Sequence, residues 1–142
     1  MSKLRNYFKI IALLLLFSSC KSNDNYVPYA YVNFDIYLSD PQYYELNAIG
    51  SSVSVNHEGY KGIIIFRKSS DEFMVYDKCC TNEPTNSCEI VEETENEYVV
   101  KCNCCNSTFS LYDGYPMDGV AKLPLKEYHS QFDGDNTLSI FN

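Results

Sequence analysis

The sequence predicts a small, antiparallel all-β domain that follows an N-terminal export segment. Three observations lead to this class. Runs rich in aromatic and β-branched residues recur after residue 26, and turn-forming residues interrupt them every several positions. No amphipathic helical stretch of ordinary length follows the export segment. A chain of 142 residues is long enough for one such domain.

Residues 1–19 are predicted to be a secretory signal. Their first nine residues carry three positive charges, and residues 10–17 form an apolar run too short to span a bilayer. Two serines then precede Cys20, which resembles the lipobox of bacterial lipoproteins. The resemblance implies cleavage before Cys20, lipidation of Cys20 and attachment to a bacterial outer membrane, on either its periplasmic or its outer face. Residues 20–25 would be a lipidated tether and residues 26–142 the domain. The alternative is an ordinary cleavable signal with a chance cysteine.

The remaining chain is strongly acidic. It holds eight basic and nineteen acidic residues, which gives a net charge of −11. This charge excludes binding to nucleic-acid phosphates and to an anionic membrane face. The most acidic segment, residues 89–97, is expected to be a solvated loop face.

The strands of the first half are predicted from composition and periodicity. Residues 29–37 are rich in aromatic and β-branched residues, and residues 53–55 alternate as in a half-exposed strand. Residues 43–46 fit either a short helical turn or a bridge between strands. The continuous apolar run 63–67 is typical of a central buried strand, and residues 73–76 return antiparallel to it.

The second half is predicted to contain two cysteine loops between short strands. Residues 89–92 and 97–101 form a hairpin between the loops, and residues 108–112 start a further strand. Residues 116–121 are expected to be a loop, with Gly119 at a positive φ. Pro124 lacks a backbone N–H, so its extended segment cannot form a complete set of strand hydrogen bonds. A hairpin of residues 127–132 and 137–141 closes the domain.

Six cysteines remain in the domain, crowded into the two loops. Disulfides are the default for an even cysteine count in an exported chain. Crowding instead favours a local site, because widely spaced cysteines make better staples. The residues alone leave iron, zinc and disulfides open. The six are Cys79, Cys80, Cys88, Cys102, Cys104 and Cys105.

Both cysteine loops resemble a known pattern. Residues 76–82 (YDKCCTN) and 102–109 (CNCCNSTF) resemble the two cluster-binding loops of Rieske iron–sulfur proteins, and residues 113–128 are similar to the segment after the second loop in that family. The resemblance covers residues 63–141. More narrowly, the chain resembles Rieske-like lipoproteins of the Bacteroidetes group. This implies a small antiparallel sandwich or barrel with two facing cysteine loops, and a function in electron transfer.

The resemblance also implies two cysteine and two histidine ligands, and this chain lacks both histidine ligands. Rieske loops supply Cys-x-His and Cys-x-x-His to a [2Fe–2S] cluster. Cys80 and Cys102 fall at the two cysteine positions, whereas Asn82 and Cys105 stand where the histidines would be. An amide is a poor ligand for ferric iron and a thiolate is a good one.

A second family feature is a disulfide that joins the loops, and the resemblance implies a Cys88–Cys104 bridge. Cys79, Cys80, Cys102 and Cys105 then remain as the ligands of any cluster. His57 and His129 lie outside both loops and are expected to be ordinary surface or core residues.

Three states are considered for these four cysteines. The first is a [2Fe–2S] cluster with altered ligands. Zinc is less favoured, because adjacent Cys79 and Cys80 are not the usual partner for a C-x-x-C half-site. The third possibility is no metal at all, with Cys80 and Cys102 joined as a disulfide staple. Thiol–disulfide exchange is not expected, because Cys102-x-x-Cys105 leads into a strand and not a helix.

The alternative function is a cluster-free, disulfide-stapled structural or binding domain. An N-terminal cluster of tyrosines could serve as a binding platform, although packing within the sheet is the favoured expectation for such residues. These are Tyr26, Tyr29, Tyr31, Tyr37, Tyr43 and Tyr44.

Overall fold

The computed structural model of the chain describes residues 26–142. The expected signal (residues 1–19), the lipidation site Cys20 and the tether up to residue 25 lie outside the described residues. Within residues 26–142, no helix is long and apolar enough to cross a membrane.

Every strand pairing in the described part of the chain is antiparallel, which confirms the predicted all-β class. One 3-10 helix accompanies the strands. The elements are β1 (Asn33–Tyr37), η1 (Pro41–Asn47), β2 (Ser52–Val55), β3 (Ile63–Arg67), β4 (Phe73–Asp77), β5 (Val91–Glu93), β6 (Val99–Cys102), β7 (Thr108–Ser110), β8 (Pro116–Asp118), β9 (His129–Phe132) and β10 (Thr137–Phe141).

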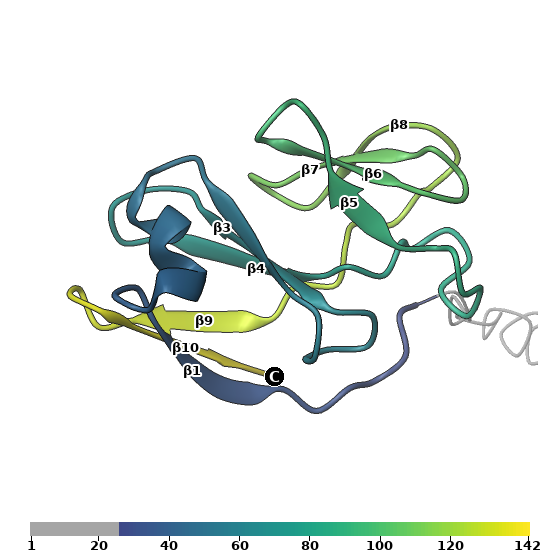
Figure 1. The fold of residues 1–142 in the computed structure, drawn as a ribbon. Coiled ribbons are helices and arrows are strands. Elements are labelled where there is room, and N and C mark those ends of the chain that lie inside the picture. Colours follow the sequence, from purple (N-terminus) through teal and green to yellow (C-terminus); the bar gives the residue numbers. More distant parts are fainter. Residues whose placement is uncertain (1–25) are drawn as a thin grey trace, which may run out of the picture.

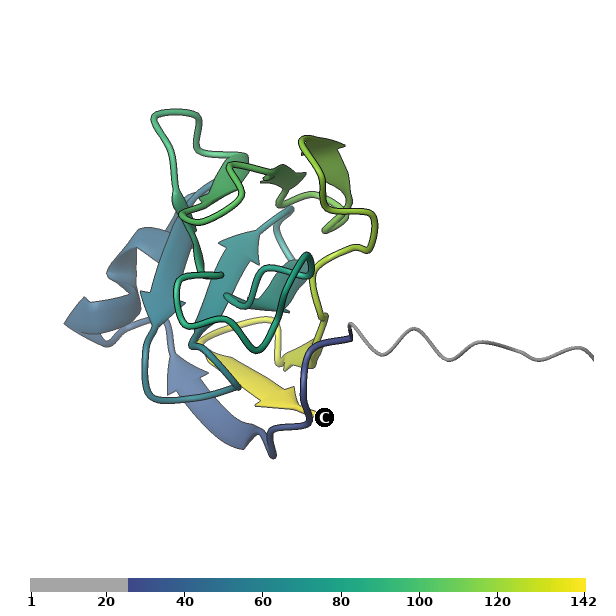
Figure 2. The same ribbon diagram turned by 90° about the vertical axis from the view of Figure 1, so that its right-hand side faces the viewer.

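Three small sheets form three layers, with orders β1-β10-β9, β2-β3-β4 and β5-β6-β7-β8. The β2-β3-β4 sheet lies between the other two (Figures 1 and 2). On β3, Ile63 and Ile65 pack into the core shared with β1 and β10, whereas Ile64 and Phe66 pack into the core shared with β6 and β7. Both faces of β3 are buried, which fits the continuous apolar sequence of its first four residues.

The segment that the sequence left open, residues 43–46, lies within η1. Pro41 occupies the first turn, where its missing N–H costs nothing. The Asp40 carboxylate caps this end by accepting a hydrogen bond from the Gln42 amide at 2.9 Å. Leu46 is the buried residue of the element and joins the core next to β2 and β3.

Two predictions differ most from the observed elements. The first strand begins at Asn33, and residues 26–32 lie outside any sheet although Val27 and Val32 are buried. The predicted loop 116–121 contains β8, which pairs with β7 across an irregular register. Pro116 is tolerated there because β8 is an edge strand.

The expectation that the N-terminal tyrosines pack within a sheet was also wrong for five of the six, which are exposed: Tyr26, Tyr29, Tyr31, Tyr37 and Tyr44. Alternation explains the outcome for Tyr37, because the chain buries Ile36 and Leu38 and turns the side chain between them to solvent.

A buried carboxylate, Asp77, ends β4 and joins four segments. Its Oδ1 accepts hydrogen bonds from the backbone amides of Lys61 (3.2 Å) and Cys79 (2.8 Å). Its Oδ2 accepts from the Tyr60 amide (2.6 Å) and the Tyr128 hydroxyl (2.8 Å). Asp77 therefore fixes the start of the first cysteine loop against the residue 60 turn and the C-terminal segment.

Replacing Asp77 by asparagine should destabilise the domain by about 3 kcal/mol, because both oxygens accept hydrogen bonds and an amide has only one acceptor. Its NH₂ group would face buried donors. Urea unfolding of the chain measures the loss. The matched variant Asp35→Asn, at an exposed position of β1, should change the free energy of unfolding by about 0.5 kcal/mol or less. Equal stabilities of the two variants would contradict this role.

Candidate metal centre between the cysteine loops

The first cysteine loop leaves β4 and folds back on itself. The Val91 amide donates to the Lys78 carbonyl at 2.7 Å, and the Cys80 amide donates to the Glu89 carbonyl at 3.0 Å. These two bonds close the loop like a short ladder. They bring Cys80 and Glu89, nine positions apart in sequence, next to each other.

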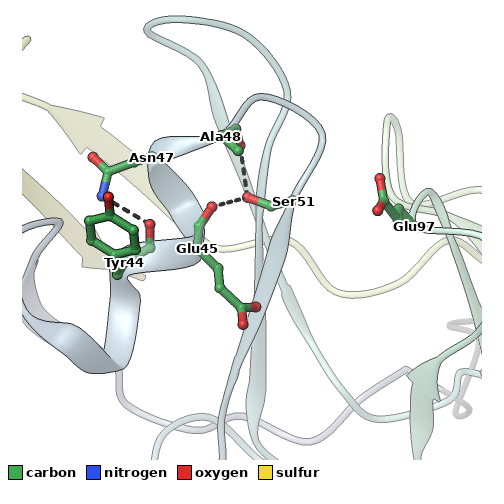
Figure 3. Close-up of a pocket in the computed structure, with 6 residues that line it drawn as sticks. All are labelled: Tyr44, Glu45, Asn47, Ala48, Ser51 and Glu97. Carbon is green, nitrogen blue, oxygen red and sulfur yellow. Dashed lines mark hydrogen bonds between the residues drawn. The ribbon is translucent and has the colours of Figure 1, made fainter.

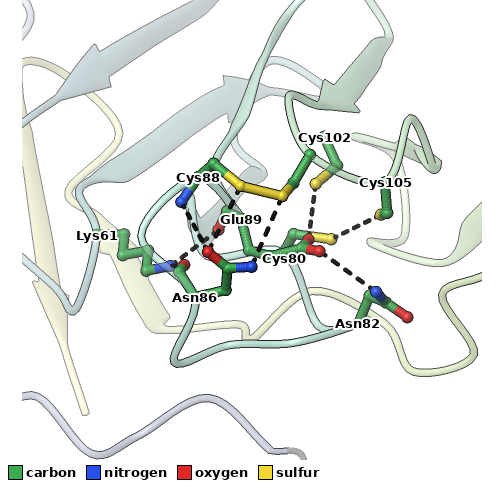
Figure 4. The surroundings of a disulfide bond; sticks show 9 residues. Lys61, Cys80, Asn82, Asn86, Cys88, Glu89, Cys102 and Cys105 are labelled. Atoms are coloured by element: carbon green, nitrogen blue, oxygen red, sulfur yellow. Dashed lines mark hydrogen bonds between the residues drawn. A yellow bond between two sulfur atoms is a disulfide. The ribbon is translucent and has the colours of Figure 1, made fainter.

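The second loop begins at Cys102, the last residue of β6, and turns tightly. The Cys102 amide donates to the Ser107 carbonyl at 2.9 Å, and the Asn106 amide donates to the Cys102 carbonyl at 3.1 Å. Asn106 has a φ of +60°, which asparagine tolerates better than most residues. The turn holds Cys102 and Cys105 on the same side of the loop (Figure 4).

Buried Ser107 ties the second loop to the segment after β8. Its Oγ accepts hydrogen bonds from the amides of Val120 and Ala121, each at 3.0 Å, and from the Cys105 thiol at 3.2 Å. Gly119 has a φ of +99°, as predicted, and a Cβ there would lie 2.6 Å from the Ser107 Cα. The close approach explains why a glycine stands at this position.

The two loops are also joined directly. Cys88 and Cys104 form a disulfide across a sequence separation of 16 (Figure 4). The Asn103 amide donates to the Ile90 carbonyl at 2.9 Å beside it. A bridge across a separation of this length stabilises a domain by about 3 kcal/mol in the chain-entropy description.

Four potential ligand atoms converge between the loops. The thiols of Cys80, Cys102 and Cys105 and a carboxylate oxygen of Glu89 all lie within 4.8 Å of one another. The Cys80 and Cys105 sulfurs are 3.6 Å apart, and the Cys102 thiol donates to Glu89 Oε2 at 2.8 Å. Three of the four residues are buried, and Cys105 is half-buried.

Cys79 lies outside this group, although the sequence placed it among the candidate ligands. Its thiol contacts the carbonyl oxygens of Cys80 and Pro84, each at 3.5 Å. Neighbouring side chains on an extended chain point to opposite sides, so Cys79 turns away where Cys80 turns in. Burial raises the pKa of the Cys79 thiol to about 12.

Glu89 corrects the expectation that residues 89–97 form a solvated face. It is only 2% exposed, whereas Glu92, Glu93, Glu95 and Glu97 are exposed. Nothing in the sequence separates it from these glutamates except its place next to Cys88. That neighbour is the one signal that could have pointed to it.

The site favours neutral thiols and a charged carboxylate. Burial, followed by the hydrogen bond with Glu89, raises the pKa of both the Cys80 and the Cys102 thiols. Burial also opposes ionisation of Glu89. Hydrogen bonds from Cys102, Cys80 and other neighbours outweigh it and lower the pKa of Glu89.

The other predicted residues take no ligand position within residues 26–142. Asn82, at the first histidine position of the Rieske pattern, donates to Glu89 Oε1 at 3.3 Å. His57 and His129 are exposed and lie outside the group. Cys80 and Cys102 are both free thiols, so the staple considered between them is not formed.

A separate hollow of about 570 Å³ lies beside η1 (Figure 3). Tyr44, Glu45, Ala48 and Ser51 line it from the η1 side, and Glu97 faces them from the turn between β5 and β6. The Ser51 hydroxyl donates to the Ala48 carbonyl at 2.7 Å and also to that of Glu45. None of the four convergent ligands borders this hollow.

Comparison with known proteins identifies the fold. No family model and no curated protein sequence matches the chain. A chain in the complex of reduced oxygenase and oxidized ferredoxin of carbazole 1,9a-dioxygenase is similar, with 18% identity and a TM-score of 0.50, over 79% of this chain and 93% of its own. The Sphingomonas yanoikuyae B1 ferredoxin is also similar, with 13% identity and a TM-score of 0.49, over 78% of this chain and 99% of its own.

Likeness at this identity concerns the fold alone. The chain has a Rieske-like all-β fold in which two cysteine loops face each other, as the sequence predicts. The Rieske cluster itself does not fit the donors present. It needs two imidazoles on one iron, and this site instead offers a third thiol, a carboxylate and the Asn82 amide.

The thiols should differ in reactivity. In the metal-free folded chain at pH 8, with the Cys88–Cys104 disulfide intact, we expect iodoacetamide to modify half-buried Cys105 first among the four free thiols of the described residues. Cys79 should react at least about tenfold more slowly, because burial and a raised pKa suppress its thiolate, the reactive form. Peptide mass spectrometry over time measures the order. Denaturation should equalise the rates, and faster reaction of Cys79 in the folded chain would contradict the structure.

Proposed function

We propose that the protein is a membrane-anchored lipoprotein whose Rieske-like domain binds a redox-active metal through Cys80, Cys102 and Cys105 and serves in electron transfer. The observation that carries the proposal is the convergence of three free thiols and a buried carboxylate on one point between the loops. The fold likeness to a chain of an oxygenase–ferredoxin complex supports an electron-transfer role.

Iron is the metal we propose, since thiolates bind it well and it changes oxidation state by one electron. Three cysteines of this chain would bind the iron. Cys80 and Cys102 place two thiols from opposite loops, and Cys105 adds a third that is half-buried at the loop tip. An electron can cross most readily where the centre comes nearest to solvent, so Cys105 marks the side on which a partner would approach.

One observation favours a second candidate, a metal-free scaffold. The Cys80 and Cys105 sulfurs are 3.6 Å apart and would need only a short approach to form a disulfide. Such a chain would keep the fold without a centre and would act as a structural or binding domain.

Metal analysis separates the two candidates. The full-length chain, purified anaerobically in detergent from iron-replete cells, should contain iron, absorb visible light and change its spectrum reversibly on reduction. Cys102→Ser should lose most of the iron, because it removes a ligand. Cys79→Ser should keep the iron, because Cys79 points away from the site. A colourless, metal-free chain with a Cys80–Cys105 disulfide would establish the scaffold, and zinc alone would exclude electron transfer.

Anchoring through Cys20 is tested independently. Because lipidation requires this thiol, Cys20→Ser should move the protein from the membrane fraction to the soluble fraction. Cys79→Ser should remain with the membrane. Fractionation followed by mass spectrometry of the N-terminal peptide measures both. Retention of Cys20→Ser on the membrane would contradict the lipoprotein assignment.

A further inference from the structure

We infer that the site takes a single divalent transition-metal ion and that Glu89 is its fourth ligand. The inference deepens the proposed function and rests on it only for the identity of the natural ion. Its basis is the arrangement of one carboxylate and three thiols from two loops.

The donor atoms have the spacing of one tetrahedral ion. A metal–sulfur bond of about 2.3 Å places two sulfurs about 3.8 Å apart in a tetrahedron, and the Cys80 and Cys105 sulfurs are 3.6 Å apart. All four donors lie within 4.8 Å of one another. A two-iron cluster carries its ligands as two pairs, one on each iron, separated by the cluster core. No such division is seen among these four donors.

Glu89 has the environment of a ligand and not of a surface charge. It is 2% exposed, yet no cation contacts its carboxylate in the described part of the chain. Its side-chain partners are the Cys102 thiol and the Asn82 amide. A buried carboxylate without a counter-charge is costly, and a bound cation removes that cost.

The cysteine count also favours a metal over disulfides. Cys88 and Cys104 are already paired, and Cys79 points away from the site. Three thiols therefore surround Glu89. A disulfide can pair only two of them and would leave the third buried beside a carboxylate, whereas a tetrahedral ion uses all three.

Metal binding at this site requires no change of oxidation state. A divalent ion breaks the three S–H bonds, forms three metal–sulfur bonds and one metal–oxygen bond to Glu89, and releases three protons to solvent. The bound centre carries a net charge of −2. The Lys61 ammonium group, which donates to the Glu89 carbonyl at 3.2 Å, lies beside it as a partial counter-charge.

Cobalt tests the centre, because Co²⁺ reports both coordination geometry and thiolate ligation in its spectrum. We expect the metal-free full-length chain, with Cys88–Cys104 oxidised and the other thiols reduced, to bind one Co²⁺ with tetrahedral d–d bands and sulfur-to-cobalt charge transfer. Glu89→Gln should weaken Co²⁺ binding at least about tenfold, since even outer partners of a metal site are worth that much. It should also alter the d–d bands. Glu92→Gln, an exposed neighbour in the same acidic run, should match the wild type.

Glu89→Cys provides a gain of signal if the glutamine variant does not fold. A fourth thiolate should raise the charge-transfer intensity per cobalt by about one third while one ion still binds. Binding of two ions per chain, a Glu89→Gln spectrum and affinity equal to wild type, or a Glu89→Cys intensity equal to wild type would each overturn the inference.

The two proposals can fail separately. A chain that carries zinc in cells and binds one Co²⁺ through Glu89 contradicts electron transfer and supports this centre. If the chain carries redox-active iron and Glu89→Gln leaves the Co²⁺ spectrum unchanged, the result supports electron transfer and contradicts Glu89 as the fourth ligand of a single ion.

Discussion

The buried carboxylate of Asp77 is the interaction on which the position of the site depends. It stands where the middle sheet ends and the first cysteine loop begins, and its two oxygens accept four hydrogen bonds from three separate segments. Without it, the amide of Cys79 and the hydroxyl of Tyr128 would be buried without partners. Asp77 therefore helps to fix the direction in which the chain leaves β4, and the backbone hydrogen bond from Cys80 to Glu89 then positions Cys80.

The three-layer arrangement explains why Cys80 and Cys102 are buried. The core between the middle sheet and β5–β8 includes Cys80 and Cys102 together with Phe66 and Phe109. The sulfurs therefore sit at the edge of an apolar cluster and not in an open loop. Burial is also the main reason that the pKa values of both thiols are raised, so a metal ion must displace protons to bind there.

Much of the fold was predictable because its strands carry strong local patterns. The run 63–67 was predicted with both of its bounds, since a strand buried on both faces is mostly apolar and here Arg67 marks its half-buried end. The site was harder to predict. Cys79 and Cys80 are identical in type, and which thiol turns inward follows from backbone hydrogen bonds of the loop that the sequence does not reveal. Glu89 was missed because its burial depends on a loop closure that composition does not reveal.

The Cys88–Cys104 disulfide, whose formation depends on redox conditions, lies next to the convergent side chains. Cys88 immediately precedes Glu89, and Cys104 immediately precedes Cys105, so one covalent bond joins the neighbours of two convergent residues from opposite loops. Where thiols stay reduced, the loops lack this bond and the donor set is held by hydrogen bonds alone. The complete arrangement therefore requires conditions in which disulfides form. Under the proposed function, the centre would be filled by an ion available under those same conditions.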